Sequence, residues 1–394
     1  MKESLFNYRF EYENQKYIFN TNNNGLIQIN NDIFTEEERE YLRVNRFWVD
    51  DNEDEIALLE REINHNIQKR QKELELTIAL TNYCNFSCVY CYQNKNEKLM
   101  TTEVANMIIE KIDRILNDNI FEGINIHYFG GEPLLNIPVL IYLDENIKKI
   151  TDKIGIVYKA FLTTNGSMLS KELLQKVKFS SIQLTFDGLE KTHDRLRVSD
   201  HFHFKEEIEL IENIMNFSQA KVLLRTNICK QNKDEIIALH KYIFEKFGNE
   251  RIEINPNRTI KYHQDDSFEM LSVQEYAEVA YQIKLLWSEQ KGKFELPVPR
   301  STPCKFSYGN AYAISPEGYC TFCSGSMDQE KKYFFDVDIE NKKMFSVRKE
   351  CKKCNILPLC LGGCIIQYNL RAGACTYEKY ELKNILISYI KHIS

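Results

Sequence analysis

The sequence lacks the features that mark a membrane, secreted or nucleic-acid-binding protein. It has no uninterrupted apolar run of the about 20 residues that a membrane-spanning helix needs. Its first residues, MKESLFNYRF, do not contain the apolar stretch of a signal peptide. Its 51 basic residues do not exceed its 57 acidic ones, and it has no Lys/Arg block. We therefore expect a cytoplasmic protein with no membrane and no nucleic-acid partner.

Cysteine, in contrast, is plentiful and unevenly placed. Of the 12 cysteines, three fall between residues 84 and 91, eight between residues 304 and 375, and Cys229 stands alone. A reducing cytoplasm argues against a disulfide framework. Two dense groups separated by a long stretch with one cysteine therefore indicate metal ligation. Cys229, at the end of a predicted strand, is expected to be a small buried hydrophobic residue.

Periodicity divides the chain into three predicted domains. Residues 1–72 read as a small α+β module, with short strands around an Asn-rich turn and a helix that Thr35 begins and Glu38 completes as a capping box. Residues 73–295 alternate strands with helices, and residues 296–394 lose this alternation, become Cys-rich and end in an amphipathic helix. The six strands are expected at residues 74–80, 123–129, 155–163, 181–186, 221–228 and 251–257.

Strands that alternate with helices predict a parallel sheet, because each crossover helix must cover a sheet face. Six units are too few for a closed eight-stranded barrel. The expected fold class is therefore α/β, a partial (β/α)6 TIM-like barrel with a small N-terminal α+β module and a C-terminal Cys-rich domain. Its chemistry is expected at the carboxyl ends of the strands.

The first cysteine group, Cys84, Cys88 and Cys91, lies in the loop after the first barrel strand. Three thiolates at x3 and x2 spacing can bind three irons of a cubane 4Fe–4S cluster. The fourth iron is left without a protein ligand, as a catalytic site requires. A structural zinc site is the alternative, but zinc normally takes four ligands with paired CxxC spacing.

This CxxxCxΦC pattern, with Tyr90 as its aromatic residue, resembles the signature of the radical S-adenosylmethionine (SAM) superfamily. The resemblance implies that the open iron binds SAM and that an electron cleaves SAM to methionine and a 5′-deoxyadenosyl radical, with Tyr90 near the adenine. The segment Gly130-Gly131-Glu132-Pro133 is similar to the GGEP motif of that superfamily, in which Glu132 would receive the SAM ammonium. Alone, such a segment is an ordinary strand-to-helix turn.

Polar residues also end the later strands. Asn165 follows the third strand, Asp187 the fourth, and Arg225 lies on the fifth, so the resemblance places ribose contacts at this edge. Arg197, in a stretch similar to one in peptide-modifying members, is the candidate partner of the SAM carboxylate. Taken singly, each of these residues fits turn chemistry or a solvated charge equally well. No catalytic acid or base is identified.

The C-terminal cysteines resemble the SPASM domain, an auxiliary-cluster domain of many radical SAM maturases. The resemblance implies two further 4Fe–4S clusters, three in all. The distal cluster would be bound by Cys351, Cys354, Cys360 and Cys375. The proximal cluster would be bound by Cys304, Cys323 and Cys364. From spacing alone, two zinc ribbons are the alternative.

The proximal cluster lacks an obvious fourth ligand. Some family members have another cysteine shortly before the position of Cys304, whereas residues 295–303 contain none. Either Cys320, three residues before Cys323, supplies the fourth thiolate, or one iron is open to the substrate. We favour Cys320.

The function expected from these features is peptide maturation. Auxiliary clusters can carry away an electron when the substrate is oxidised, which favours a crosslink. The N-terminal module is compatible with the leader-peptide-recognition module of maturases, which adds the leader as an extra strand; a simple extension has equal weight. We expect a thioether first, or a carbon–carbon bond second, in a ribosomally synthesised precursor peptide with a leader sequence. A flavodoxin- or ferredoxin-type electron donor is expected.

Five alternatives stay open. A peptide epimerase and a decarboxylating enzyme are two of them, and three more can be weighed against the sequence. One is an anaerobic sulfatase-maturating-type enzyme that forms formylglycine, but such enzymes tend to place an Asp after the position of Cys323, where this chain has Ser324. Another is a zinc-stabilised Cys-rich binding protein, which would be colourless and would not bind SAM. The last is an RNA-modifying radical SAM enzyme, which would need a basic groove.

Overall fold

In the computed structural model, the chain forms two compact units. The larger unit comprises Arg70–Leu271 and Lys305–Lys342, and the smaller one Met1–Lys69, Ser272–Cys304 and Lys343–Ser394. The structure describes residues 1–29, 34–93, 95–118, 121–248, 251–261, 267–307, 310–321, 323–325, 332–337, 344–364 and 375–393. No helix in these ranges is both long enough and apolar enough to cross a bilayer. The sequence division at residues 72 and 295 stays a prediction.

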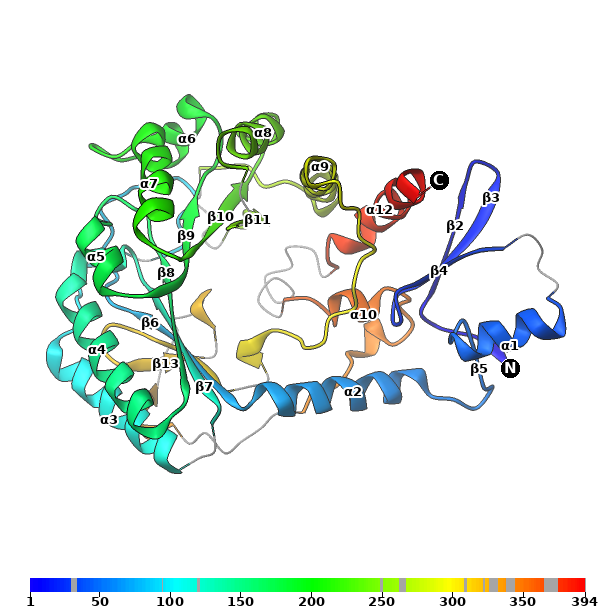
Figure 1. Ribbon diagram of the computed structural model, residues 1–394, viewed down its shortest axis with the longest axis horizontal. Coiled ribbons are helices and arrows are strands. Elements are labelled where there is room, and N and C mark those ends of the chain that lie inside the picture. Colours follow the sequence, from blue (N-terminus) through cyan, green and yellow to red (C-terminus); the bar gives the residue numbers. More distant parts are fainter. Residues whose placement is uncertain are drawn as a thin grey trace. The chain divides into compact units, whose positions relative to one another are not determined.

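The larger unit contains a nine-stranded sheet in the order β11-β10-β9-β8-β7-β6-β12-β13-β14 (Figure 1). Each neighbouring pair from β6 to β11 is parallel, which confirms the six predicted strands and the α/β fold class. These strands are β6 (Glu73–Ala79), β7 (Gly123–Phe129), β8 (Val157–Thr163), β9 (Phe179–Thr185), β10 (Lys221–Ile228) and β11 (Ile252–Arg258). The sequence did not reveal the extension of the sheet: β12 (Ala311–Ile314) pairs parallel with β6, and β13 (Tyr319–Thr321) and β14 (Lys332–Tyr333) continue antiparallel.

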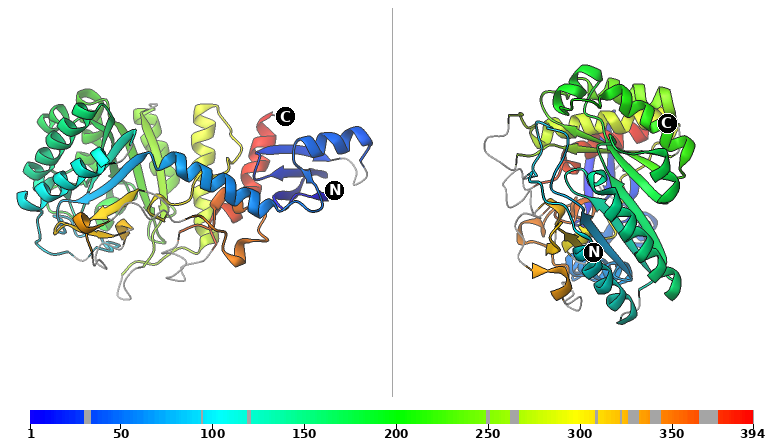
Figure 2. Two further views of the ribbon diagram at one scale, coloured as in Figure 1. Left: turned by 90° about the horizontal axis from the view of Figure 1, so that it is seen from below. Right: turned by 90° about the vertical axis from the view of Figure 1, so that its left-hand side faces the viewer.

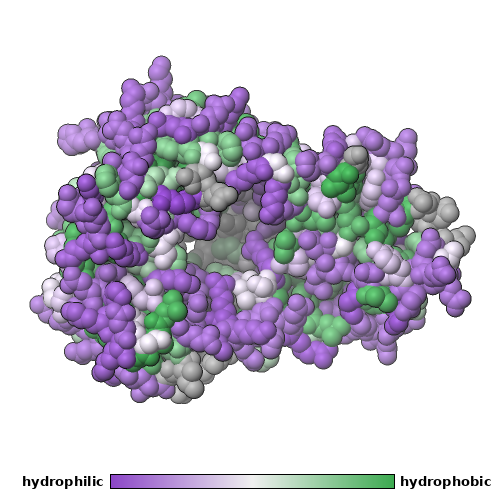
Figure 3. Space-filling view, viewed as in Figure 1, coloured by the Kyte–Doolittle hydropathy of each residue, from purple (hydrophilic) through white to green (hydrophobic). Residues whose placement is uncertain are grey.

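Helices cover one face of this sheet (Figures 1 and 2). They are α3 (Thr102–Asp118), η1 (Pro133–Asn136), α4 (Ile137–Ile154), α5 (Lys171–Lys176), α6 (Glu190–Leu196), α7 (Phe204–Phe217) and α8 (Ile236–Phe247). In α3, Ile108 and Ile112 are buried at i, i+4 spacing, as in an amphipathic helix. The outer side of these helices shows mainly hydrophilic residues (Figure 3). Short 3₁₀ turns, η2 (Lys305–Ser307) and η4 (Phe334–Asp336), complete the described elements of the unit.

The smaller unit contains a three-stranded antiparallel sheet, ordered β2-β3-β4. Its strands are β2 (Asn7–Tyr12), β3 (Gln15–Asn20) and β4 (Gly25–Ile29), and β1 (Lys2–Glu3) pairs separately with β5 (Trp48–Val49). The predicted capping box begins α1 (Glu36–Val44): Thr35 Oγ1 accepts from the Glu38 backbone N–H at 3.2 Å, and the Thr35 N–H donates to Glu38 Oε2 at 2.8 Å. Helix α2 (Glu55–Arg70) follows.

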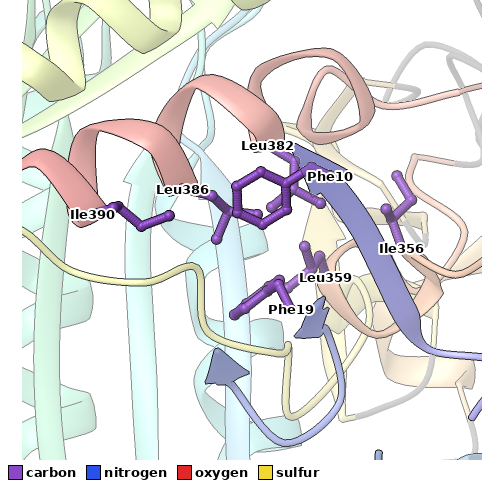
Figure 4. Packing of buried hydrophobic residues seen from close by; sticks show 7 residues of the cluster. All are labelled: Phe10, Phe19, Ile356, Leu359, Leu382, Leu386 and Ile390. Carbon is purple, nitrogen blue, oxygen red and sulfur yellow. The ribbon is translucent and has the colours of Figure 1, made fainter. Parts of the chain in front are cut away.

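The core of the smaller unit joins its sheet to the C-terminal helix (Figure 4). Leu382, Leu386 and Ile390 recur every four residues along α12 (Glu378–Ile393), which confirms the predicted amphipathic helix. This stripe packs with Phe10, Phe19, Ile356 and Leu359. The remaining described elements are α9 (Val273–Lys291), η5 (Lys349–Cys351) and α10 (Leu357–Cys360).

Candidate functional site

The first cysteine group lies in the loop between β6 and α3, and its three thiols are free and partly exposed. The Phe86 N–H donates to Cys84 Sγ at 3.4 Å. Burial raises the pKa of Cys84 and raises that of Cys88 to about 12, although the Arg197 guanidinium favours the Cys88 thiolate. The charge of Cys91 adds to both upward pKa shifts, so the three thiols lie within electrostatic reach of one another.

These thiols fit the three-ligand cluster that the sequence predicts. Among the described residues, no three Cys, His, Asp or Glu side chains converge on the position of a single metal ion. A cubane cluster, however, takes each thiolate on a different iron, so its ligands need not converge on one point. Binding to iron would also favour the thiolate form that burial disfavours here. The assignment of Cys84, Cys88 and Cys91 to the cluster stays a prediction.

The glycines after β7 bring their backbone against the start of the cysteine loop. Gly130 has φ +136°, and a Cβ there would lie 2.3 Å from the Thr81 carbonyl oxygen. A Cβ on Gly131 would lie 2.2 Å from the carbonyl oxygen of Tyr83. The Gly131 N–H donates to Thr81 O at 2.8 Å, and the Glu132 N–H to Tyr83 O at 2.9 Å. Only glycine allows this approach between the two segments.

Glu132 is fully buried and is held by three hydrogen bonds. Its Oε1 accepts from Thr164 Oγ1 at 2.6 Å and from the Leu134 N–H at 2.9 Å, while Oε2 accepts from the Asn165 N–H at 2.6 Å. Burial raises the pKa of Glu132 to about 6 in spite of these donors. A carboxylate offers about four acceptor positions, so one is left for an ammonium group. Pro133 follows as the first residue of η1.

Asn165 connects the end of β8 to the cysteine loop. Its Nδ2 donates to Asn85 Oδ1 at 2.8 Å and lies 3.9 Å from Cys84 Sγ. Its Oδ1 accepts from the backbone N–H of Ser167 at 3.0 Å and from Ser167 Oγ at 2.7 Å. Asn85 and Ser167 could not be predicted from the sequence, because single polar residues in loops carry no periodic signal.

Asp187 connects the cysteine loop to β10. It is fully buried, accepts from the Tyr90 hydroxyl and accepts from the Asn227 N–H at 2.7 Å. Burial raises the pKa of Asp187, while Arg197 and the Tyr90 hydrogen bond oppose that rise. Asn232, also missed, donates to the backbone oxygens of Asp187 and Asn227 at 2.8 Å each. The ribose and adenine contacts of Asp187 and Tyr90 stay predictions.

The hydrophobic surroundings of Tyr90 include Cys229. Tyr90 packs against a buried cluster of Leu196, Cys229 and Phe268. Cys229 is completely buried, which confirms its prediction as a small hydrophobic residue.

The two arginines predicted for the site differ in their surroundings. Arg197 follows α6, is 6 % exposed and lies over the Phe86 ring at 5.3 Å. Its buried Nε has no hydrogen-bond partner, which fits a missing anionic acceptor. Arg225 is half-buried and donates its Nε to Asn227 Oδ1 at 2.8 Å. Arg197 is therefore the better candidate for a carboxylate.

A chain of polar side chains on the face of the sheet opposite the helices was also not predicted. His127 Nε2 lies 2.7 Å from Thr163 Oγ1, Gln183 Nε2 donates to Thr163 Oγ1 at 3.4 Å, and Asn255 Nδ2 donates to Gln183 Oε1 at 3.3 Å. Burial lowers the pKa of His127 to about 4, so it is neutral at pH 7. The alternation in GINIHYF was the signal, because it puts Asn125 and His127 on one face and isoleucines on the other.

The second cysteine group is divided between the units. Cys351, Cys354, Cys360, Cys364 and Cys375 belong to the smaller unit, and so does the exposed Cys304. Burial raises the pKa of Cys360 to about 11, and the charge of Cys354 raises the pKa values of both Cys351 and Cys360. These three thiols are therefore neighbours.

Cys320 and Cys323 belong to the larger unit. Cys320 is buried on β13, and Cys323 Sγ accepts from the Gly325 N–H at 3.3 Å. The division of the second group into a distal and a proximal cluster stays a prediction.

Comparisons with known sequences place the site in a family. Residues 78–243 match the Radical SAM superfamily. The radical SAM cyclopropyl synthase TigE of Paramaledivibacter caminithermalis is 24 % identical over 372 residues, covering 83 % of this chain and 76 % of TigE. A GTP 3′,8-cyclase of Helicobacter pylori is 31 % identical over 45 % of this chain, which spans 53 % of that protein. An uncharacterized protein of Methanocaldococcus jannaschii is 34 % identical over 29 % of this chain, which spans only 39 % of it.

Solved structures share the fold at low sequence identity. The anSMEcpe enzyme with bound AdoMet and Cp18Cys peptide has a TM-score of 0.61 at 18 % identity, covering 80 % of this chain and 99 % of that one. Streptococcus suis SuiB bound to precursor peptide SuiA has a TM-score of 0.55 at 16 % identity, covering 94 % and 96 %. The family match covers the cysteine loop and most of the barrel strands, and the solved structures share the fold, so residues 78–243 form a domain of the radical SAM superfamily.

Proposed function

We propose that this enzyme is a peptide maturase that forms an intramolecular crosslink in a ribosomally synthesised precursor peptide, a thioether first and a carbon–carbon bond second. The observation that carries the radical part of this proposal is that three free thiols, the buried Glu132 and the unpartnered Arg197 Nε lie within electrostatic reach of one another. The peptide part is supported by two similar structures that hold a peptide, SuiB with SuiA and anSMEcpe with Cp18Cys.

In this proposal, the barrel residues bind and orient SAM. Glu132 accepts from the SAM ammonium, Arg197 donates to its carboxylate, and Tyr90 packs near the adenine. Asn165, Asp187 and Arg225 serve the polar groups of the nucleoside. When bound by Cys84, Cys88 and Cys91, a 4Fe–4S cluster with SAM supplies a 5′-deoxyadenosyl radical that removes a hydrogen atom from the substrate.

Crosslinking explains why the chain carries a second cysteine group. To make a thioether, a C–H and an S–H bond break and an S–C bond forms. One hydrogen atom goes to the 5′-deoxyadenosyl group, and one proton and one electron must still leave the substrate. Two auxiliary 4Fe–4S clusters, bound by the predicted C-terminal cysteines, are suited to accept that electron. A flavodoxin- or ferredoxin-type protein is the proposed partner that reduces the enzyme. Such thiolate chemistry needs reduced cysteines, so we propose a cytoplasmic location.

The sheet of the smaller unit is the proposed leader-peptide site. Within the described residues, β3 is the only strand of that sheet with which β2 or β4 pairs. The outer edges of β2 and β4 are therefore open in the part of the chain that the structure describes. An open edge can accept an extended peptide as a further strand. Phe10 of β2 and Phe19 of β3 belong to the same buried cluster as Leu382, Leu386 and Ile390 of α12, so the sheet packs on that helix.

The test substrate is a short Cys-containing precursor peptide, to be sought among the peptides encoded beside this gene. After incubation with SAM and a strong reductant, we expect the peptide to lose two hydrogens and one alkylatable thiol. Loss of two hydrogens with every thiol still free would instead indicate a carbon–carbon bond, the second choice of this proposal. The similarity to the cyclopropyl synthase TigE supports that second choice. A hydrazine-reactive aldehyde would contradict crosslinking and indicate formylglycine.

A further inference from the structure

A cavity of about 420 Å³ lies within the smaller unit, and none of the residues assigned to SAM lines it. It is bounded by α9, α12 and the extended segment that includes residues 293–298. Leu359 and Leu382 line the cavity and also belong to the core cluster that supports the β2-β3-β4 sheet. The cavity is thus built on the same packing as the proposed leader-peptide site.

Part of the cavity lining is apolar. It includes Leu285, Leu296, Pro297, Val298 and Ile385. Val298 is 69 % exposed, which places an apolar side chain in solvent at the cavity. Such a surface favours a ligand with an apolar side chain, because contact removes both surfaces from water.

The lining also contains two ion pairs, in each of which the carboxylate is less exposed than the cation. Glu381 pairs with Lys284, and Glu378 Oε1 accepts from Arg300 Nη2 at 2.6 Å. Glu381 is buried and Glu378 is mostly covered, with side-chain exposures of 2 % and 13 %, whereas Lys284 and Arg300 are 40 % and 46 % exposed. The second oxygen of each carboxylate is buried without a hydrogen-bond partner. A buried oxygen without a hydrogen-bond donor destabilises the folded protein, and a ligand that donates to it would remove this cost.

The charges of the lining constrain the ligand. The lining has three basic residues, Lys284, Lys293 and Arg300, and three acidic ones, Glu295, Glu378 and Glu381. Its net charge is therefore zero, which does not favour a charged ligand. It favours a ligand with neutral hydrogen-bond donors for Glu378 and Glu381 and neutral hydrogen-bond acceptors for Lys284 and Arg300. A terminal carboxylate torsion is soft, so Glu378 and Glu381 can turn toward such donors.

We propose that this cavity binds an extended peptide segment, through one large apolar side chain and the backbone amides on either side of it. The apolar side chain lies on the Leu285 and Leu296 side. Backbone N–H groups donate to Glu378 and Glu381, and backbone carbonyls accept from Lys284 and Arg300. The inference takes its partner class from the proposed function, and it adds a second recognition site for the precursor peptide beside the sheet edge.

The probe is a phage-displayed library of random dodecapeptides, selected on the full-length reconstituted enzyme. Ser288→Trp fills the cavity from α9, and Glu289→Trp places the same side chain on the exposed neighbouring position. We expect enriched sequences to share a large apolar residue. Their synthetic copies should bind about tenfold more weakly to the Ser288→Trp enzyme, which is the effect of losing one buried apolar side chain, and normally to the Glu289→Trp enzyme.

Because the Ser288→Trp enzyme could lose binding simply by misfolding, a second variant tests the cavity without filling it. Val298→Asp changes an exposed apolar position, so it should weaken the same peptides while leaving thermal unfolding unchanged. Equal binding to the wild-type, Ser288→Trp and Val298→Asp enzymes would overturn the proposal. So would the absence of enriched peptides, or equal competition by leucinamide, which would indicate a small-molecule site.

The same preparations are assayed for release of 5′-deoxyadenosine from SAM without any peptide. Normal SAM cleavage with no peptide bound at the cavity would refute the cavity alone. Absent SAM cleavage in the wild-type enzyme would refute the proposed function, whatever the peptides do.

Discussion

The backbone N–H of Asn165 donates to Oε2 of Glu132 across 2.6 Å, which ties the end of β8 to the segment after β7. Asn165 also reaches Asn85 in the cysteine loop, so one residue connects three strand ends. The carboxyl edge of the sheet is therefore ordered by the protein's own hydrogen bonds. Glu132 and Asn165, which we propose to contact SAM, are thus held in position by hydrogen bonds within the protein.

The first prediction concerns Glu132→Gln. The amide NH₂ of Gln cannot accept the hydrogen bonds that the carboxylate receives, so we expect unfolding free energy to fall by about 1–3 kcal/mol. SAM affinity should fall roughly tenfold with the loss of the ammonium partner. Urea unfolding and equilibrium SAM binding measure the two effects. Glu110→Gln, on the exposed side of α3, is the matched control and should change neither. Unchanged SAM affinity in Glu132→Gln would remove Glu132 from the SAM site.

The second prediction concerns Gly131→Ala. A Cβ at this position meets the Tyr83 carbonyl oxygen at 2.2 Å, so the cysteine loop has to move. We expect unfolding free energy to fall by about 1–3 kcal/mol and release of 5′-deoxyadenosine to be largely lost. Gly155→Ala is the control, because that glycine has a positive φ but no atom within 4 Å of a new Cβ. It should cost about 1 kcal/mol and leave SAM cleavage intact. Full activity in Gly131→Ala would show that the close approach is dispensable.

The third prediction concerns Arg197→Lys. A lysine keeps the charge but loses the planar fork and the buried Nε, so SAM affinity should fall roughly tenfold. Iron content should stay the same, since Arg197 is no cluster ligand in this account. Arg195→Lys, exposed on α6, is the control and should bind SAM normally. If Arg197→Lys binds SAM as tightly as the wild type, the carboxylate is bound elsewhere.

The fourth prediction is a pH dependence that arises at His127. Burial lowers the pKa of His127 to about 4, from about 6.5 for an unperturbed histidine. The unfolded chain therefore binds more protons between these values, and the stability that the neutral side chain contributes is complete above pH 6.5 and is lost as pH falls toward 4. Between pH 7.5 and pH 5 this loss is about 2 kcal/mol.

His127→Gln should remove that part of the pH dependence. The measurement is urea unfolding of both proteins at pH 7.5 and pH 5, without SAM. His65→Gln, on the exposed side of α2, is the control and should keep the wild-type dependence. Parallel pH curves for the wild type and His127→Gln would contradict a buried neutral His127.

The six barrel strands could be predicted because apolar runs and helices alternate, and the capping box at Thr35 could be predicted because it is local. The pairing of β12 with β6 could not be predicted, because β12 has only four residues and its partners on β6 lie more than 200 residues earlier in the sequence. The motifs indicated Glu132, Arg197 and the cysteines. They did not indicate Asn85, Ser167 or Asn232, because the role of each depends on which loop lies opposite it.

The most direct test of the central claim is anaerobic reconstitution of the wild type and of a variant with Cys84, Cys88 and Cys91 all changed to Ala, each then incubated with SAM and a strong reductant. The account predicts about twelve irons per wild-type chain and release of 5′-deoxyadenosine, and in the variant about two thirds of the iron and no release. A colourless, zinc-loaded wild type, or a variant that still cleaves SAM, would contradict it.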